Sequence, residues 1–279
     1  MSTADVSSRS LAELVSLTGR RAVVTGGGRG LGKAIASRLA EAGADLLIGD
    51  IDEELALTAA GQLARRHGVR VIGAAMDVTD AASVAATADR AVADLGGLDI
   101  WVNNAGIFPA VPLLEMTEET WDKVFAVNAR GVFVGAREAA RRMAAAGTGG
   151  VIVNIVSTAG FRGSAPGLAA YVGSKHAVRG VTRELALELA PLGIRVLGVA
   201  PSFVPTEGNM LAAAAVMTDD IPPSDLPPTE IPPTDLMLNG PIGRVGVPDD
   251  IARVVLFCAS DLSTFMTGST LLADGGDTA

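Results

Sequence analysis

Short runs of β-branched and other apolar residues alternate with longer alanine-rich segments along almost the whole chain. The runs cover residues 21–25, 45–48, 69–74, 98–103, 150–156, 194–200 and 269–272. This alternation is typical of βαβ units, which build a parallel sheet, and the nearly unbroken apolar runs suit strands buried on both sides. The pattern predicts an α/β fold: a doubly wound, seven-stranded parallel sheet with helices on both faces. Its ligand site should lie beyond the carboxyl ends of the strands.

The 279 residues suit one domain with one large insertion. We expect an N-terminal extension at 1–16, a single domain at 17–279 and, within it, an inserted loop at 206–238. In this loop an acidic-aliphatic-Pro-Pro-hydroxyl unit recurs three times, beginning at Asp220, Asp225 and Glu230. The prolines exclude a helix, so the loop should be extended or rich in turns. Its place after the sixth strand predicts a mobile cover over the substrate; a surface repeat without function is the alternative.

The charge of the chain excludes some classes of partner. A formal net charge of −9 argues against binding to nucleic acid or to an anionic membrane surface. We find no apolar stretch long enough for a signal peptide or a membrane span, so we expect a cytoplasmic protein. The single cysteine, Cys258, lies in an apolar run and is interpreted as a core residue.

A glycine cluster follows the first predicted strand, at Gly26, Gly27, Gly28, Gly30 and Gly32. Glycines there allow a sharp turn and let a pyrophosphate approach a helix N-terminus, although the spacing departs from G-x-G-x-x-G. The second strand ends at Asp50, where a carboxylate can bind an adenosine ribose and repel a 2′-phosphate. Arg29 could instead contact such a phosphate or lie free in solvent. We give Asp50 more weight and predict NAD as the cofactor.

One pair of residues stands out from the composition. The chain has a single tyrosine, Tyr171, and one of only three lysines follows it at Lys175. Residues four apart share one face of a helix, and a nearby ammonium lowers the pKa of a phenol toward neutrality. The pair therefore predicts a general acid or base. Ser157, at the end of the fifth strand, would add a hydroxyl, with Thr158 as a less favoured alternative.

Together with Asn103-Asn104-Ala105-Gly106 and Asn128, these motifs resemble the NAD(P)-dependent short-chain dehydrogenase/reductase family, from about Leu17 to Gly276. The resemblance implies a Rossmann-like fold and hydride transfer between a nicotinamide and an alcohol or ketone. It implies that Tyr171 passes the proton, Lys175 binds the nicotinamide ribose, Ser157 binds the substrate oxygen and Asn128 holds a relay water. It also implies cofactor contacts from Gly26, Arg29, Gly30, Leu31, Gly32, Asp50, Ile51, Asp77, Val78, Asn104, Ala105, Gly106, Tyr171, Lys175, Pro201, Val204 and Thr206. Pro201-Ser202 stands where the family usually has Pro-Gly.

The expected pocket wall is mostly apolar and comprises Phe108, Phe161, Phe203, Met210 and Met217. We therefore expect a neutral secondary alcohol or ketone, with Ser157 at its oxygen. Arg162 could meet a carboxylate or lie at the rim. His67 and His176 are too far apart in sequence to suggest a metal pair, and no metal is predicted.

Two other functions remain open at this point. One is an NADPH-dependent 3-oxoacyl thioester reductase of the same family, which Asp50 opposes. The other is a non-catalytic dinucleotide-binding regulator, which would not need Ser157, Tyr171 and Lys175. The resemblance also implies a homo-oligomer, either a dimer or a tetramer.

Overall fold

Seven parallel strands form one sheet in the computed structural model, which describes residues 5–207 and 241–279. The sheet order is β3-β2-β1-β4-β5-β6-β7, with every neighbouring pair parallel. The strands are β1 (Arg21–Thr25), β2 (Asp45–Asp50), β3 (Val71–Ala75), β4 (Ile100–Asn103), β5 (Gly150–Ile155), β6 (Ile194–Pro201) and β7 (Thr270–Ala273). The predicted α/β fold is confirmed, and strand ends differ from expectation by two residues at most.

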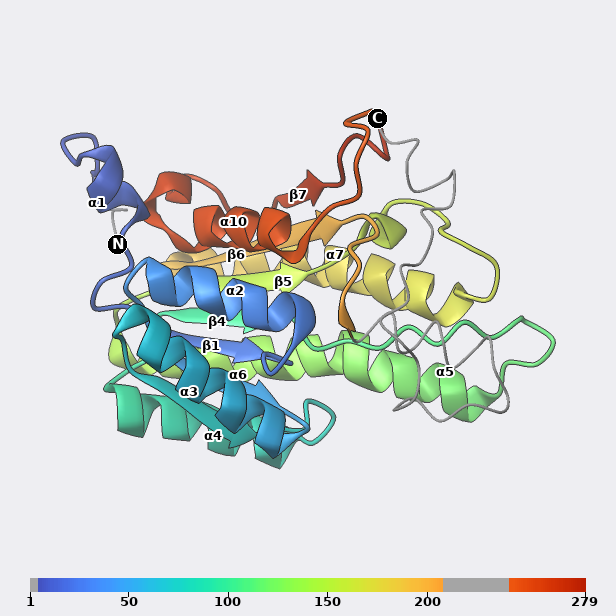
Figure 1. Ribbon diagram of the computed structural model, residues 1–279, viewed down its shortest axis with the longest axis horizontal. Coiled ribbons are helices and arrows are strands. Elements are labelled where there is room, and N and C mark those ends of the chain that lie inside the picture. The colour runs from blue at the N-terminus through green and yellow to red at the C-terminus, as the bar shows by residue number, and fades with distance from the viewer. Residues whose placement is uncertain (1–4, 208–240) are drawn as a thin grey trace.

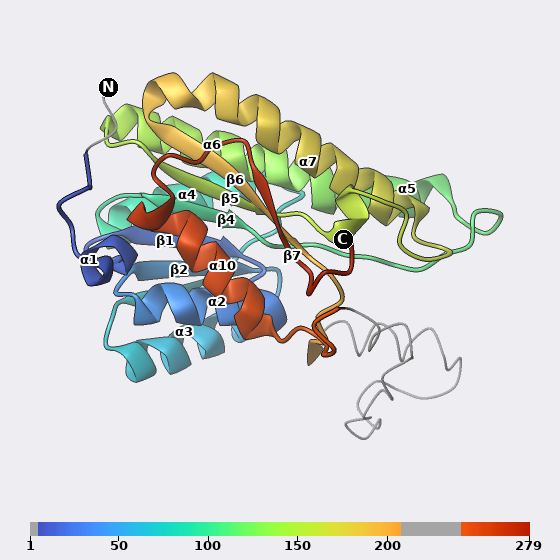
Figure 2. The ribbon, with the colours of Figure 1, turned by 90° about the horizontal axis from the view of Figure 1, so that it is seen from above.

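Helices cover both faces of this sheet (Figure 1, Figure 2). The α-helices are α1 (Leu11–Val15), α2 (Gly30–Glu41), α3 (Glu53–His67), α4 (Ala81–Leu95), α5 (Glu118–Phe125), α6 (Gly131–Ala146), α7 (Ala169–Leu189) and α10 (Pro248–Ala259). A π-helical turn, η1 (Ala126–Arg130), joins α5 to α6, and short 3₁₀ turns occur at η2 (Thr158–Gly160), η3 (Ala190–Leu192) and η5 (Asp261–Ser263).

Alternation along each strand divides the core into two layers. In β1, Ala22 and Val24 pack with α2, α3 and α10, whereas Val23 points to the opposite layer with α4, α6 and α7. All three residues are fully buried. Both faces of a central strand are therefore apolar, which explains why its sequence shows no polar alternation. Cys258 is buried in the first layer, where burial raises the pKa of its thiol to about 12.

The N-terminal segment is held against the C-terminal part of the sheet. Leu17 is buried and its N–H donates to the Ala42 carbonyl at the end of α2. Arg9 and Arg20 both pair with Asp261, which begins η5. The expected extension at 1–16 therefore contacts the body of the fold through Arg9, and the residues that follow it hold its other end in place.

A buried carboxylate fixes the start of β1 against the start of β4. Asp99 is 5% exposed and accepts hydrogen bonds from the Arg21 backbone N–H at 2.7 Å, from Arg21 Nη2 at 2.8 Å and from Arg21 Nε. Because these strands are neighbours, the pair ties the edges of two βαβ units together at the amino ends of the strands.

Replacing Asp99 by alanine should lower the free energy of unfolding by about 2 kcal/mol, since it leaves a half-buried guanidinium and a backbone N–H without their carboxylate. Denaturant unfolding followed by circular dichroism measures this. Asp94→Ala is the matched control, because the Arg90–Asp94 pair is exposed on one helix and should contribute less than about 0.5 kcal/mol. Equal losses in the two variants would contradict the assignment.

Candidate active site

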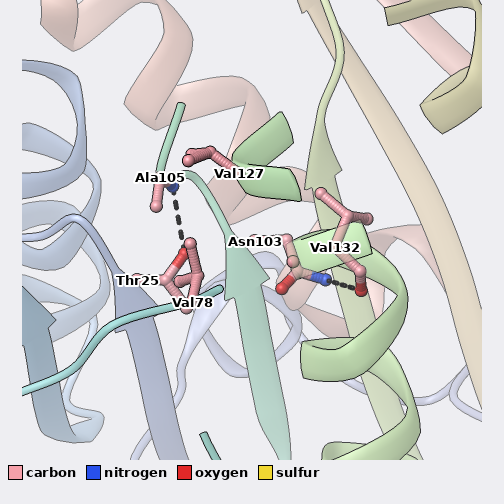
Figure 3. Close-up of a pocket in the computed structure, with 7 residues that line it drawn as sticks. Thr25, Val78, Asn103, Ala105, Val127 and Val132 are labelled. Atoms are coloured by element: carbon pink, nitrogen blue, oxygen red, sulfur yellow. Dashed lines mark hydrogen bonds between the residues drawn. The ribbon is translucent and has the colours of Figure 1, made fainter. Parts of the chain in front are cut away.

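The strand order reverses between β1 and β4, and the expected site residues gather at the carboxyl ends of these strands and of β5. Such a switch point leaves a crevice where the flanking connections diverge to opposite faces. A small pocket lies there, lined by Thr25, Val78, Asn103, Ala105, Val127, Gly131 and Val132 (Figure 3). The position predicted from the strand pattern is therefore the position at which the candidate side chains converge.

The glycine loop is locked onto the end of β4. Thr25 Oγ1 accepts the N–H groups of Asn104 and Ala105, each at 3.0 Å, and Asn104 Nδ2 donates to the carbonyls of Thr25 and Gly26. Gly26 has φ +61°, and a Cβ on Gly32 would overlap the Gly26 carbonyl oxygen. A Cβ on Gly26 would in turn lie 2.9 Å from the Ala105 Cα after β4. The loop can fold against α2 and approach the end of β4 this closely only without side chains at these two positions.

This packing leaves the N-terminus of α2 facing the crevice. The helix begins at Gly30, and its N-cap residue, Arg29, makes no side-chain capping bond. Helix N-termini present unpaired N–H groups and the positive end of the helix dipole, a combination that suits a pyrophosphate. The arrangement therefore fits the dinucleotide that the glycine cluster predicts, with Gly30, Leu31 and Gly32 in the first turn.

Asp50 lies directly beneath the glycine loop. It is 8% exposed, and its Oδ2 accepts the Gly28 N–H at 2.9 Å while Oδ1 accepts the Asp52 N–H at 3.2 Å. A Cβ on Gly28 would lie 2.9 Å from Oδ2, so this contact needs glycine. A carboxylate can accept about four hydrogen bonds, which leaves capacity for the two hydroxyls of a ribose.

The remaining predicted cofactor residues lie around this crevice at different depths. Ile51 is exposed, and the Asp77 carboxylate accepts the Thr79 N–H and hydroxyl. Val78 packs against Gly131, and Thr206 lies against Gly30. Pro201 ends β6, and Val204 is buried. Arg29 is exposed, and its side chain has no hydrogen bond or ion pair within the part of the chain that the structure describes.

Lys175 is buried on α7 and reaches the end of β5. Its ammonium donates to the Ile155 carbonyl at 2.8 Å and lies 5.7 Å from the centroid of the Tyr171 ring. Only 4% of Lys175 is exposed, and burial lowers the pKa of its ammonium to about 8. The group therefore remains mostly protonated at pH 7, as a buried cation beside the phenol.

Tyr171 and Ser157 meet above this lysine. The Ser157 hydroxyl lies near the Tyr171 phenol, where it favours the phenolate, and Ser157 Oγ accepts the Ala159 N–H at 3.1 Å. Burial raises the pKa of the Tyr171 phenol above its ordinary value of 10, and the Ser157 hydroxyl opposes this rise. Our expectation that Lys175 lowers the phenol pKa is wrong for the chain alone, because desolvation of the phenolate is the larger effect.

Asn128 sits in the π-helical turn η1 with its side chain fully engaged. Its Oδ1 accepts the Ile107 N–H at 2.8 Å, and its Nδ2 donates to the Ile107 carbonyl at 2.7 Å and to Ser174 Oγ at 3.1 Å. Ser174 in turn donates to the Tyr171 carbonyl. Ser174 was missed in the sequence, although its place directly before Lys175 was the available signal. The Asn128 side chain thus anchors the loop after Gly106 to α7.

Some of the predicted substrate residues lie in the described part of the chain and others do not. Phe108 is half-exposed and meets the Tyr171 ring edge-on, with 5.9 Å between centroids. Phe161 lies under the Arg179 guanidinium at 3.9 Å, and Phe203 is 41% exposed. Arg162 forms an ion pair with Asp277 at 2.7 Å, joining the segment after Ser157 to the C-terminal turn. Met210, Met217 and the insertion beyond Glu207 lie outside the described residues.

Metal-binding groups do not cluster in the described part of the chain: across 5–207 and 241–279, no three His, Cys, Asp or Glu side chains are placed to hold an ion. In the same ranges no helix is long and apolar enough to cross a membrane. His67 contacts Ser37, and His176 contacts the Val172 carbonyl of its own helix.

The phenol of Tyr171 can be titrated directly, because it is the only one in the chain. Ultraviolet absorbance after a rapid pH jump should give a pKa above 10 in the folded protein and the ordinary value of about 10 in denaturant. Ser157→Ala should raise the folded value further, since it removes the hydroxyl that favours the phenolate. A folded pKa at or below 10 would contradict the burial of this group.

Comparison with known proteins agrees with this geometry. A family profile described as "Enoyl-(Acyl carrier protein) reductase" matches residues 26–278. The chain is 40% identical over 94% of its length to 4-formylbenzenesulfonate dehydrogenase TsaC1/TsaC2 of Comamonas testosteroni, covering 99% of that protein. It is 37% identical over 91% of its length to L-2,3-butanediol dehydrogenase of Corynebacterium glutamicum, covering 97% of it.

Comparison with solved structures finds proteins of closely similar fold. A short-chain type dehydrogenase/reductase from Mycobacterium marinum superposes with a TM-score of 0.85 at 33% identity, over 97% of this chain and all of that one. Profile, sequence relatives and structure cover nearly the same residues, including the glycine loop and the Tyr171–Lys175 pair. The chain belongs to the short-chain dehydrogenase/reductase family of oxidoreductases.

Proposed function

We propose that the protein is an NAD-dependent oxidoreductase that interconverts a secondary alcohol and its ketone. The observation that carries the proposal is the meeting of Ser157, Tyr171 and the buried Lys175 ammonium at the carboxyl end of β5. A phenol, a hydroxyl and a fixed cation on one face of a crevice form a proton-transfer site. Hydride exchange with the substrate carbon is the chemistry that a bound nicotinamide supplies.

The side chains have different tasks in this proposal. Ser157 donates to the substrate oxygen and Tyr171 exchanges a proton with it, so the oxygen is held by two hydroxyls. Lys175 favours the phenolate electrostatically and offers its remaining N–H groups to the nicotinamide ribose. Because the Asn128 side chain is engaged by Ile107 and Ser174, a relay water would have to be held by its backbone carbonyl.

The choice of NAD rests on Asp50. A buried carboxylate at the end of β2 suits the 2′- and 3′-hydroxyls of an adenosine ribose and disfavours a phosphate in the same place. Gly26, Gly30, Leu31 and Gly32 would hold the pyrophosphate, and Ile51, Asp77 and Val78 the adenine. Ala105, Gly106, Pro201, Val204 and Thr206 would border the nicotinamide half, while Asn104 would act by holding the glycine loop.

A neutral apolar substrate is supported by the pairing of Arg162. The half-exposed guanidinium is already neutralised by Asp277, so an anionic substrate would have to displace a carboxylate. Phe108 supplies apolar surface beside Tyr171, whereas the Phe161 ring packs on a buried apolar cluster and is covered by the Arg179 guanidinium. The similar proteins differ here, since L-2,3-butanediol is neutral and 4-formylbenzenesulfonate is an anion, so substrate charge is a useful variable for a screen.

An NADPH-dependent 3-oxoacyl thioester reductase is a second candidate. A 3-oxoacyl-[acyl-carrier-protein] reductase of Chlamydia muridarum is 38% identical over 93% of this chain. Arg29, exposed in the glycine loop, is the feature of this chain that favours NADPH. The position of Asp50 opposes it, so cofactor preference separates the two functions.

Exposed apolar side chains support a homo-oligomer, a dimer or a tetramer. Phe265 is 99% exposed and Leu114 is 98% exposed, and contact with another subunit would bury such apolar groups. We propose no nucleic-acid partner, in keeping with the charge.

Replacing Tyr171 by phenylalanine should reduce turnover by about 10³-fold or more while NADH affinity stays within a few-fold, because only the proton-transfer group is lost. The measurement is a screen of secondary alcohols with NAD and of their ketones with NADH, including neutral and carboxylate versions of one ring. The neutral substrate should be preferred over the carboxylate.

Ser157→Ala should also be inactive, whereas Thr158→Val should be active. Retention of a tenth of wild-type activity by Tyr171→Phe would refute the mechanism.

NAD(H) should give a higher kcat/KM than NADP(H), because a phosphate beside the Asp50 carboxylate is repelled and displaces its ribose contact. Asp50→Ala should narrow the difference mainly by weakening NAD(H). Arg29→Ala is the companion variant and should lower only the residual activity with NADP(H). A wild-type preference for NADP(H) would favour the thioester reductase instead.

A further inference from the structure

A line of buried side-chain hydrogen bonds runs beneath the candidate active site. Trp101 Nε1 donates to Asn103 Oδ1 at 2.7 Å, Asn103 Nδ2 donates to Asn154 Oδ1 at 2.8 Å, and Asn154 Nδ2 donates to Thr182 Oγ1 at 3.0 Å. The Thr182 hydroxyl then donates to the Val178 carbonyl at 2.8 Å. Each of the four side chains in this line is at most 3% exposed. None of them belongs to the proposed catalytic or cofactor-binding set.

The indole of Trp101 fixes which group donates and which accepts in every hydrogen bond of the line. An indole N–H can only donate, so Asn103 must present its oxygen to Trp101 and its amide nitrogen to Asn154. Asn154 must then turn its own oxygen toward Asn103 and its nitrogen toward Thr182. The threonine hydroxyl, having accepted that bond, is left to donate to the helix carbonyl. No amide can flip without breaking two bonds.

This line joins the three elements that carry the proposed machinery. Asn103 precedes Asn104 at the end of β4 and also donates to the Val132 carbonyl of α6 (Figure 3). Asn154 is its direct neighbour on β5, in register, and Ser157 follows three residues later. Thr182 is on α7, the helix of Tyr171 and Lys175. The line therefore spans from the cofactor side of the crevice to the proton-transfer side.

Helix α7 is thus tied to β5 by two polar contacts at different heights. Near the site the Lys175 ammonium reaches the Ile155 carbonyl, and about two helical turns further along Thr182 reaches Asn154. The residues around the lower contact are apolar, including Ile152 of β5 and Ala186 of α7. Apolar surfaces tolerate small shifts at little cost, whereas a directional bond between buried groups is satisfied in one arrangement.

We propose that Asn154 and Thr182 are positioning residues that set the register of α7 on β5, and so the distance of Tyr171 from Ser157. The inference rests on the proposed function for the identity of the reacting groups. An apolar pair of the same shape would serve stability as well or better, so the value of the buried polar pair lies in specifying one arrangement. Sub-ångström placement matters because reacting groups that are misplaced by 1 Å can lose about 10²-fold in rate.

Thr182→Val tests this by removing the hydroxyl and keeping the shape. It should lower kcat at least 10-fold, leave the KM for NAD within two-fold and raise the phenol pKa of Tyr171, because the effect of the Ser157 hydroxyl on the phenolate is weakened. Thr182→Ser keeps the hydroxyl and should restore all three values. Thr87→Val is the matched control: Thr87 is also buried, and its hydroxyl donates to the Ser83 carbonyl four residues back on α4.

A double variant distinguishes a loss of positioning from a loss of the folded structure. The double change Asn154→Leu with Thr182→Val replaces the polar pair by an apolar one and leaves the Asn103 amide with the Val132 carbonyl as its acceptor. It should lose some thermal stability, stay folded at the assay temperature and still turn over at least 10-fold more slowly. Wild-type kcat in a folded Thr182→Val or double variant would overturn the proposal. So would a Thr182→Ser protein as impaired as Thr182→Val, since packing of the methyl group would then be the cause.

The phenol titration separates this inference from the proposed function. Tyr171 is the only tyrosine, so its pKa reports the placement of the phenol whether or not any alcohol is turned over. An inactive wild-type protein whose phenol pKa rises in Thr182→Val, and not in Thr87→Val, would refute the reaction and support the positioning. An active wild-type protein whose phenol pKa is unchanged by Thr182→Val would support the reaction and refute the positioning role.

Discussion

Burial of the Lys175 ammonium is the constraint on which the site depends. A buried cation needs hydrogen-bond acceptors, and the carbonyl at the end of β5 supplies one. The bond holds α7 against the end of β5 and keeps Tyr171, four residues before Lys175, on the face of α7 that carries the cation. The same burial lowers the lysine pKa to about 8 and raises that of the phenol, so the site holds two proton-binding groups displaced from their ordinary values in opposite directions.

Local patterns predicted the sheet, and they singled out chemical groups that lie at its carboxyl edge, because both leave signals within a few residues. Strands show as apolar runs, and Tyr171 and Lys175 are rare residues at helical spacing. Contacts between distant segments left no such signal: the Asn103–Asn154–Thr182 line, the Arg162–Asp277 pair and the engagement of Asn128 by Ile107 each join residues more than 20 apart. The direction of the Tyr171 pKa shift was missed for the same reason, since desolvation depends on everything packed around the group.

Asp50 shows how recognition and folding can use one side chain. Its carboxylate accepts the Gly28 N–H, so it helps to shape the loop that would receive the pyrophosphate as well as the site for the ribose. Altering it changes both at once. A substitution of Asp50 that changes cofactor preference would therefore have to keep an acceptor for the Gly28 N–H. The lack of space for a Cβ on Gly28 restricts the directions from which another side chain could supply that acceptor.

The π-helical turn at Ala126–Arg130 makes chain length part of the specification of the fold. Each residue of a regular α-helix advances its face by about 100°, so removing one residue to restore an ordinary helix between α5 and α6 would rotate one helix against the other by that angle. Val132, Val134 and Met143 of α6 would then leave the core, or Asn128 would leave Ile107. A single-residue deletion there should thus destabilise the fold more than most substitutions do. A substitution keeps the rotation of α6 relative to α5, whereas a deletion changes it.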